Sequence, residues 1–436
     1  MKITVHRGAE EIGGNTIELE SKGARILLDY GAPLPKIDPV TNKSVYPTPE
    51  QTILNIPGLY EDGTPPLLGV VISHNHQDHF GGLLAKPISA KVSVYMTAAM
   101  EALVRLQGKM PRDTVTLRAD IHHYKKGETF DIGPFRLTSY LMDHSAPESF
   151  GFVIEVEGKR LIYTGDYRKH GNKREAFRQF IDAKMGPVDL LITEGTQASI
   201  PSGPTEQEVL EDIEALVRGR SGAMYVMCSG QDVDLITSLG EIAEAHGRYL
   251  AVDGYIAMVL ETLKAFVKRD SDIDLKIPGL GDEHLKIIDS PATAKIAKLP
   301  EYAEAYARMK PHLVSWDWVN ANHGKLIMPV RAYSQYWLER NIEDFSGAML
   351  IYSMWNGYRV EESFHETLEF FKSRGLPEFL VHASGHAYFS AIREMVESKK
   401  PRHIIPVHTE APANFTWAFG AERVHILKNG GSYTLE

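Results

Sequence analysis

The segment HNHQDH at residues 74–79 constrains this chain more than any other part of its sequence. It follows the apolar run LLGVVIS, which predicts a buried strand that ends at the first histidine. Alternate residues at a strand end share a face, so His74 and His76 can approach one ion together. Where the chain then turns into a helix, Asp78 and His79 can point to a second ion. Imidazole and carboxylate groups suit Zn²⁺, and the alternative is a solvated histidine-rich turn.

Three further candidate ligands occur downstream, each at the end of an apolar run. They are His144 in LMDHS, Asp166 in LIYTGD and His408 in HIIPVH. A single histidine in such a place is more typical of an ordinary surface residue. Together with the HNHQDH segment, however, these residues make a set of six to seven ligands, which chance explains poorly.

The pattern of predicted elements divides the chain into three stretches. Residues 1–199 are predicted to form mainly short strands that are separated by glycines. Strands and helices are predicted to alternate through residues 200–369, as in a parallel α/β domain. Thr205 and Glu208 form a capping box at the first helix of that stretch. The strand-rich pattern of residues 1–199 returns over residues 370–436, so we expect one domain that is interrupted by another. The segment from Pro33 to Leu67 holds eight of the 24 prolines, which predicts a long loop of undetermined role.

Composition narrows the class of protein. The single Cys228 rules out an intramolecular disulfide or a cysteine-based zinc cluster. No apolar run is long enough for a membrane span and no signal segment is visible, so we expect a soluble cytoplasmic protein. The net charge of −10 argues mildly against a nucleic-acid partner. Residues 200–365, however, carry 16 basic and 25 acidic side chains, so nearly all of the excess acid lies in the predicted insert.

In combination, these motifs resemble those of the metallo-β-lactamase superfamily. HNHQDH, DHS followed by FGF, and TGD occur in the order typical of it. Glu194 in ITEGT, His386 in HASGHA and His408 in IIPVH are similar to three further motifs of its β-CASP nuclease branch. EEIGGNTIELE followed by ILLDYG, with Asp29, is similar to the opening of that branch, and HASGHA…KPRHIIPVH most resembles ribonuclease J. The resemblance implies an α/β fold, namely an αββα sandwich with an inserted α/β β-CASP domain.

The resemblance also implies a role for each matched residue. His74, His76 and His144 would hold one zinc, and the other would be held by Asp78, His79 and His408. Asp166 would bridge the two ions, Mn²⁺ being an alternative metal. The two ions would activate a hydroxide that attacks phosphorus, and Asp78 would thereby belong to the catalytic set.

The other matched residues would act around the two ions. His386 would be the general acid, and Glu194 would orient it and keep it protonated. Asp29 would not bind a metal itself but would hold a metal ligand, or the loop around it, in position. His382 and Ser384 are candidate contacts to the substrate phosphate, with turn-stabilising hydrogen bonds as the alternative.

A histidine at the last motif is typical of RNA-acting members of the branch, so RNA is the expected substrate. Basic residues beside the motifs agree with this expectation. After Asp166 come Arg168, Lys169, Lys173, Arg174 and Arg178, and before the strand that reaches His408 come Lys399, Lys400 and Arg402. They could follow an RNA backbone, or they could form an ordinary solvated face.

Alternative functions stay open at this point. One is DNA cleavage, another is hydrolysis of small esters or thioesters, and a third is a non-catalytic partner in RNA processing. His408 follows Asp166 by 242 positions, which leaves room for a whole inserted domain, and small-molecule hydrolases of this superfamily generally lack such an insert. The segments YSMWNGYRVEES and AYFS depart from the ribonuclease J pattern, so the choice between exonuclease and endonuclease action and the 5′-end preference stay open. The oligomeric state is open as well, and a homodimer is one possibility.

Overall fold

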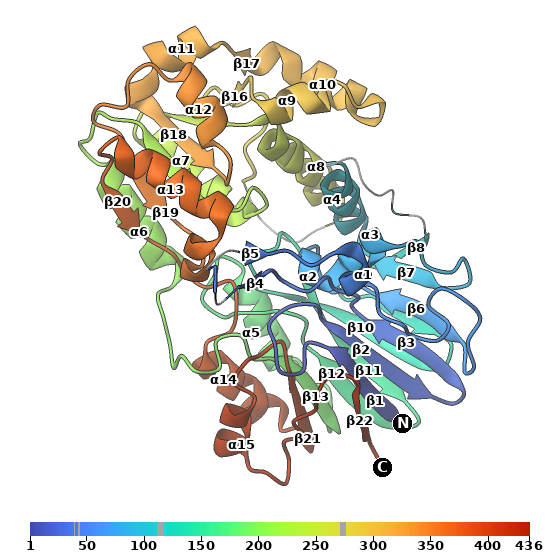
Figure 1. Cartoon of the computed structure of the whole chain (residues 1–436). Coiled ribbons are helices and arrows are strands. Elements are labelled where there is room, and N and C mark those ends of the chain that lie inside the picture. Colours follow the sequence, from blue (N-terminus) through green and yellow to red (C-terminus); the bar gives the residue numbers. More distant parts are fainter. Residues whose placement is uncertain (39, 42–43, 111–116, 118, 271–275) are drawn as a thin grey trace. The chain divides into compact units, whose positions relative to one another are not determined.

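The structure is a computed structural model of the chain, and it describes residues 1–436 except 39, 42–43, 111–116, 118 and 271–275. The chain forms two compact units (Figure 1). The first unit contains Met1–Pro35, Tyr46–Gly203 and Gly385–Glu436, and the second contains Lys36–Val45 and Pro204–Ser384. The first unit is therefore built from segments that lie far apart in the sequence, because the second is inserted into it.

Two sheets form the centre of the first unit. One runs in the order β22 (Gly431–Thr434), β1 (Lys2–Arg7), β2 (Thr16–Ser21), β3 (Ala24–Leu28), β6 (Leu67–Val71), β7 (Ser93–Met96) and β8 (Asp120–His123). The other runs in the order β21 (His403–Val407), β13 (Leu190–Glu194), β12 (Lys159–Tyr163), β11 (Ser149–Val156), β10 (Phe135–Met142) and β9 (Thr129–Ile132). β12, β13 and β21 are parallel, so their carboxyl ends lie at the same edge.

Aromatic side chains fill the space where the two sheets meet. Tyr124, which follows β8, packs edge-to-face against Phe150 and Phe152 of β11. The outer side of the second sheet packs against α5 (Arg174–Asp182), α14 (Phe389–Lys399) and α15 (Ala413–Phe419). The connections of the first sheet contribute α1 (Pro49–Thr52), α2 (Gln77–Phe80), α3 (Gly82–Ala85) and α4 (Ala98–Lys109). The α/β class and the sandwich of sheets expected from the sequence are confirmed.

The second unit is a parallel α/β domain. Its sheet runs in the order β17 (Leu313–Val314), β16 (Leu285–Ile288), β15 (Tyr249–Val252), β18 (Leu326–Val330), β14 (Met224–Met227), β19 (Met349–Tyr352) and β20 (Glu378–Leu380). The helices between these strands are α6 (Glu206–Val217), α7 (Val233–Ala245), α8 (Gly254–Asp270), α9 (Pro291–Ile296), α10 (Ala303–Met309), α11 (Trp316–Ala321), α12 (Gln335–Asn341) and α13 (Glu362–Ser373). Each pairing within the sheet is parallel, which is the pattern that alternating strands and helices predict.

The structure refines the local expectations from the sequence. Thr205 caps α6 and forms the expected capping box with Glu208. The chain returns to the first unit at Gly385 rather than near residue 370, because β20 pairs in parallel with β19 and holds the preceding residues in the second unit. The proline-rich segment contains α1 and the small hairpin of β4 (Lys36–Ile37) and β5 (Ser44–Val45), which groups with the second unit.

Candidate metal centre

The candidate ligands come from strand ends on both sheets of the first unit. His74 lies just beyond β6, and His76 is the N-cap of α2, which carries Asp78 and His79. The other three follow the second sheet, and they are His144 after β10, Asp166 after β12 and His408 after β21. A polar residue at the carboxyl end of a strand is placed by the strand and remains free of its hydrogen-bond ladder. The fold therefore gathers residues that are up to 334 positions apart in the sequence.

One group of ligand atoms comes from three histidines. One ring nitrogen each of His74, His76 and His144 lies within 4.8 Å of the other two. His144 Nε2 is 3.1 Å from His76 Nδ1, and Asp166 Oδ2 lies 3.8 Å from His144 Nε2 and 3.7 Å from His74 Nε2. Three imidazoles and a carboxylate thus face a common point, which is a donor set that suits zinc.

A second group shares Asp166 with the first. Asp78, His79 and His408 also bring one ligand atom each within 4.8 Å of the others. His408 Nε2 is 3.1 Å from Asp78 Oδ2, and His79 Nε2 is 3.1 Å from Asp166 Oδ2. Asp166 Oδ2 therefore lies within 3.8 Å of ring nitrogens from both groups.

The outward-facing nitrogens of these imidazoles are held by hydrogen bonds. Ser73 donates its hydroxyl to Asp29 at 2.8 Å, which leaves its oxygen to accept from His74 Nδ1 at 3.0 Å. His79 Nδ1 donates to Asp29 Oδ2 at 2.7 Å, and His144 Nδ1 donates to the carbonyl oxygen of Gly385 at 2.5 Å. Because each Nδ1 carries a proton, the tautomer leaves Nε2 as an inward lone pair for a metal.

His408 is oriented in the same way. Its Nδ1 donates to the hydroxyl of Thr196 at 2.7 Å, and Thr196 in turn donates to the His408 carbonyl at 3.2 Å. His408 and Asp29 both have a left-handed backbone, with φ of +52° and +59°. Residues other than glycine are strained in this conformation, and such strained residues concentrate at functional sites. Sequence reasoning missed Ser73 and Thr196, although both stand beside motif residues.

Four buried atoms at the centre have no hydrogen-bond partner among the residues that the structure describes. They are Nε2 of His74, Nε2 of His79 and both carboxylate oxygens of Asp166. A buried polar atom without a partner is costly, so native proteins rarely retain one unless another group satisfies it. A cation would satisfy all four atoms, and the residues present therefore fit a metal.

The electrostatics of the cluster agree with this conclusion. Burial and the neighbouring imidazoles hold the pKa of His74 well below its usual range, and burial lowers the pKa of His76 to about 4. Neutral imidazole is the form that binds metals. Burial would also lower the pKa of His79, but the carboxylates of Asp166, Asp29 and Asp78 outweigh it and raise that pKa well above normal. The cluster thus favours positive charge at its centre.

His386 and Glu194 form a pair at the edge of this cluster. Burial would lower the pKa of His386, but Glu194 and Asp166 raise it to about 9. His386 Nδ1 donates to Glu194 Oε2 at 3.2 Å and lies 3.5 Å from Asp166 Oδ2. The Glu194 carboxylate also accepts from the backbone N–H groups of Tyr167 at 2.9 Å and Ala387 at 3.3 Å. A buried, fixed carboxylate therefore holds a protonated imidazole beside the candidate ligands.

The two candidate phosphate contacts lie two and four residues before His386. His382 is half-buried and Ser384 is buried, and both belong to the loop that follows β20. They stand at the end of the second unit, whereas His386 belongs to the first.

Three of the basic residues beside the motifs serve the fold instead of lining a path for RNA. Arg168 is buried and pairs with Asp143 at 3.1 Å, and Lys173 is buried and donates to the Ala146 carbonyl at 3.1 Å. Lys399 is also buried and donates to carbonyls at the end of α5. The expectation that these residues follow an RNA backbone is therefore wrong for these three, because their charged groups are buried and bind other groups of the protein.

Comparison with known proteins places the fold and the cluster in a family. The family description "Beta-lactamase superfamily domain" matches residues 37–266, and "Zn-dependent metallo-hydrolase RNA specificity domain" matches residues 378–414. The chain belongs to the beta-lactamase superfamily. Within this superfamily it is a metallo-β-lactamase protein of the β-CASP type and resembles ribonuclease J, as its motifs predicted. The His/Asp cluster is accordingly a metal-binding centre of this superfamily's kind.

Curated relatives carry the name ribonuclease J. The protein from Mycobacterium tuberculosis is 24% identical over the full length of this chain, which covers 75% of that relative. Those from Sinorhizobium meliloti and Thermus thermophilus are 22% and 25% identical over 84% of this chain, covering 62% and 63% of their own lengths. A crystal structure of a protein of unknown function from Enterococcus faecalis matches with a TM-score of 0.72 at 18% identity, over 99% of both chains. That match supports the fold alone.

Proposed function

We propose that this protein is a metal-dependent ribonuclease that hydrolyses phosphodiester bonds in RNA. Membership of the beta-lactamase superfamily, the matched RNA specificity domain and the ribonuclease J relatives support this class of activity. The observation that carries the proposal is the convergence of seven candidate ligands around buried atoms that lack hydrogen-bond partners. RNA as the substrate also fits an enzyme that works in the cytoplasm.

The residues divide naturally between two zinc ions. His74, His76 and His144 would hold one, the other would be held by Asp78, His79 and His408, and Asp166 would lie between them. Bound zinc supplies nucleophilic water near neutral pH and neutralises charge that develops on the phosphate. Histidine and carboxylate ligands also accept Mn²⁺, so metal analysis of the purified protein decides between the two metals.

The chain's own residues supply the proton. His386 carries a pKa raised to about 9, so it is protonated near neutral pH and can donate to the leaving ribose oxygen. Glu194 fixes the ring through Nδ1, which leaves Nε2 as the donating atom. A positioned general acid is typically worth about 10²–10⁴-fold in rate. His382 and Ser384 are proposed to contact the substrate phosphate.

The experiment is incubation with matched, labelled RNA and DNA that carry either a 5′-phosphate or a 5′-hydroxyl. We expect metal-dependent degradation of RNA, and the product lengths reveal polarity and end preference. Faster cleavage of DNA would favour a DNA nuclease, whereas turnover of a thioester or lactam without RNA cleavage would favour a small-molecule hydrolase. If the double variant His74→Ala, Asp78→Ala degraded RNA at the wild-type rate, the two-metal mechanism would be refuted. Light scattering of the same preparation tests whether the protein is a homodimer.

A further inference from the structure

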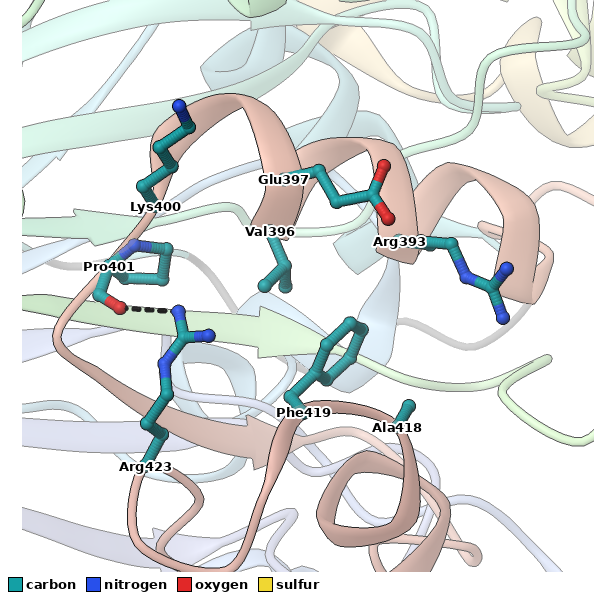
Figure 2. Close-up of a pocket in the computed structure, with 8 residues that line it drawn as sticks. All are labelled: Arg393, Val396, Glu397, Lys400, Pro401, Ala418, Phe419 and Arg423. Carbon is teal, nitrogen blue, oxygen red and sulfur yellow. Dashed lines mark hydrogen bonds between the residues drawn. The ribbon is translucent and has the colours of Figure 1, made fainter.

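A second feature of the first unit is an open pocket of about 840 Å³ between α14 and the segment that contains the end of α15. Figure 2 shows α14 on one side of it and Phe419 and Arg423 on the other. The residues that line it are Arg393, Val396, Glu397, Lys400, Pro401, Ala418, Phe419 and Arg423. None of them belongs to the metal centre.

The pocket is cationic. Arg393, Lys400 and Arg423 line it together with a single carboxylate, Glu397. Among the residues that the structure describes, the side chains of Arg393 and Lys400 have no acidic partner, and Arg423 donates to the Pro401 carbonyl at 2.7 Å (Figure 2). Unlike Arg168, Lys173 and Lys399, the exposed side chains of Arg393 and Lys400 make no ion pair or hydrogen bond among the described residues, although Arg393 lies over the ring of Phe389. They remain available to an anion from outside the chain.

An exposed tryptophan directly precedes two of the lining residues in the chain. Trp417 precedes the lining residues Ala418 and Phe419 on α15, and 82% of its surface is exposed. Tryptophan buries a large apolar area in most proteins, so such exposure is unusual for this residue. Exposed aromatic rings next to basic residues are the combination on which single-stranded nucleic acids bind, with bases stacked on the ring and phosphates on the cations.

The pocket lies at the far end of two elements that begin or end at the metal centre. α14 starts three residues after His386 and ends at Lys399, beside Lys400 in the pocket. At 1.5 Å per residue, its 11 residues span roughly 16 Å. β21 runs in the opposite direction, from near Pro401 to His408, over a similar length at about 3.3 Å per residue. A mononucleotide at the metals is too short to span this distance, so only a longer strand could contact both places.

We infer that this pocket, with Trp417, is an anchoring site for single-stranded RNA outside the metal centre. The inference rests on the proposed function and names a part of the substrate's binding surface. Phosphates would occupy the space between Arg393, Lys400 and Arg423, and a base would stack on Trp417. The site holds the strand without taking part in the chemistry, so it affects long substrates and leaves small phosphodiesters unaffected.

The chain offers a closely matched pair of variants for the test. Lys400 and Lys22 are both exposed lysines with a left-handed backbone, with φ of +46° and +48°. Glycine favours this conformation, so Lys400→Gly and Lys22→Gly each remove one positive charge without straining the fold. Only Lys400 lines the pocket.

The measurement is fluorescence anisotropy with a labelled 20-nucleotide uridine RNA whose phosphorothioate linkages resist cleavage. The salt slope is the slope of the logarithm of RNA affinity against the logarithm of salt concentration. Loss of one phosphate contact lowers its magnitude by about 0.7, which corresponds to about a fivefold loss of affinity near 0.1 M salt. We expect this loss for Lys400→Gly and for Arg393→Gln, and none for Lys22→Gly. Turnover of bis(4-nitrophenyl) phosphate is expected to stay at the wild-type level in all three variants.

A third variant separates base stacking from charge. Trp417→Ala is expected to weaken the RNA severalfold with an unchanged salt slope, because it removes a stacking surface and no charge. If the wild type binds RNA and the Lys400, Arg393 and Trp417 variants match the Lys22 control, the anchoring site is overturned and the proposed function stands. If the wild type neither binds nor cleaves RNA, the proposed function fails, and the anchoring site fails with it.

Discussion

His79 Nδ1 donates a hydrogen bond of 2.7 Å to Asp29 Oδ2, and both side chains are completely buried. The same carboxylate accepts from the Ser73 backbone N–H at 2.6 Å and from the Tyr163 hydroxyl at 2.5 Å. Asp29 follows β3 and Tyr163 ends β12, so this one side chain links the two sheets to a candidate metal ligand. The packing of the sandwich and the orientation of the site are therefore coupled.

The first prediction concerns this link. Asp29→Asn keeps the shape but turns an acceptor into an amide N–H donor that faces other donors. We expect zinc affinity to fall about 10- to 100-fold, which is the usual effect of replacing a residue that hydrogen-bonds to a metal ligand. Competition with a chelating dye measures it, and Asp131→Asn, an exposed position on β9, is the control. Equal zinc affinity in the two variants would contradict a role for Asp29 in holding His79.

The second prediction concerns a close approach of backbone segments. A Cβ atom at Gly31 would lie 1.7 Å from the carbonyl oxygen of Asp78, so a side chain there must displace the start of α2. We expect Gly31→Ala to lose at least one bound metal per chain and most of its nuclease activity. Gly281→Ala is the control, because a Cβ at Gly281 meets nothing within 4 Å. Full metal content in Gly31→Ala would show that α2 tolerates the shift.

The third prediction concerns pH. His386 acts as an acid only while protonated, so kcat falls as the pH rises through its pKa, which Glu194 helps to raise to about 9. Glu194→Gln removes a negative charge that stabilises the protonated ring, and the alkaline limb of the kcat profile should therefore move to lower pH. Glu175→Gln, on the exposed face of α5, should leave the profile unchanged. An unshifted alkaline limb in Glu194→Gln would exclude His386 as the titrating acid.

The fourth prediction concerns metal removal. Both carboxylate oxygens of Asp166 and the Nε2 atoms of His74 and His79 are buried and lack a hydrogen-bond partner among the described residues, so the first unit should lose stability without metal. A ligand at a thousand times its Kd stabilises by about 4 kcal/mol, which corresponds to a Tm shift of roughly 10 °C for a unit of this size. Calorimetry with chelator and with added zinc measures the shift. An Asp166→Asn, His408→Ala variant should respond little to either addition.

Much of the site could be predicted from the sequence because its ligands follow apolar strands. The period of each strand places its last residues, and a hydrophobic run that ends in histidine or aspartate is visible without a structure. The same reasoning predicted the alternating α/β pattern of the insert and the capping box at Thr205. The roles of the basic residues cannot be predicted in this way, because sequence does not reveal that Arg168 faces Asp143 or that Lys399 faces the end of α5.

The sequence by itself determined which atoms are available to a metal. Six consecutive residues after β6 supply four candidate ligands, and their local geometry needs only a strand and one helical turn. Only the tertiary structure decided how those atoms are held and completed. His408 comes from a strand that the inserted unit separates from Asp166, and Thr196, Gly385 and Asp29 fix the tautomers through long-range hydrogen bonds. Ligand identity is local chemistry, whereas the direction of each lone pair depends on packing between distant segments.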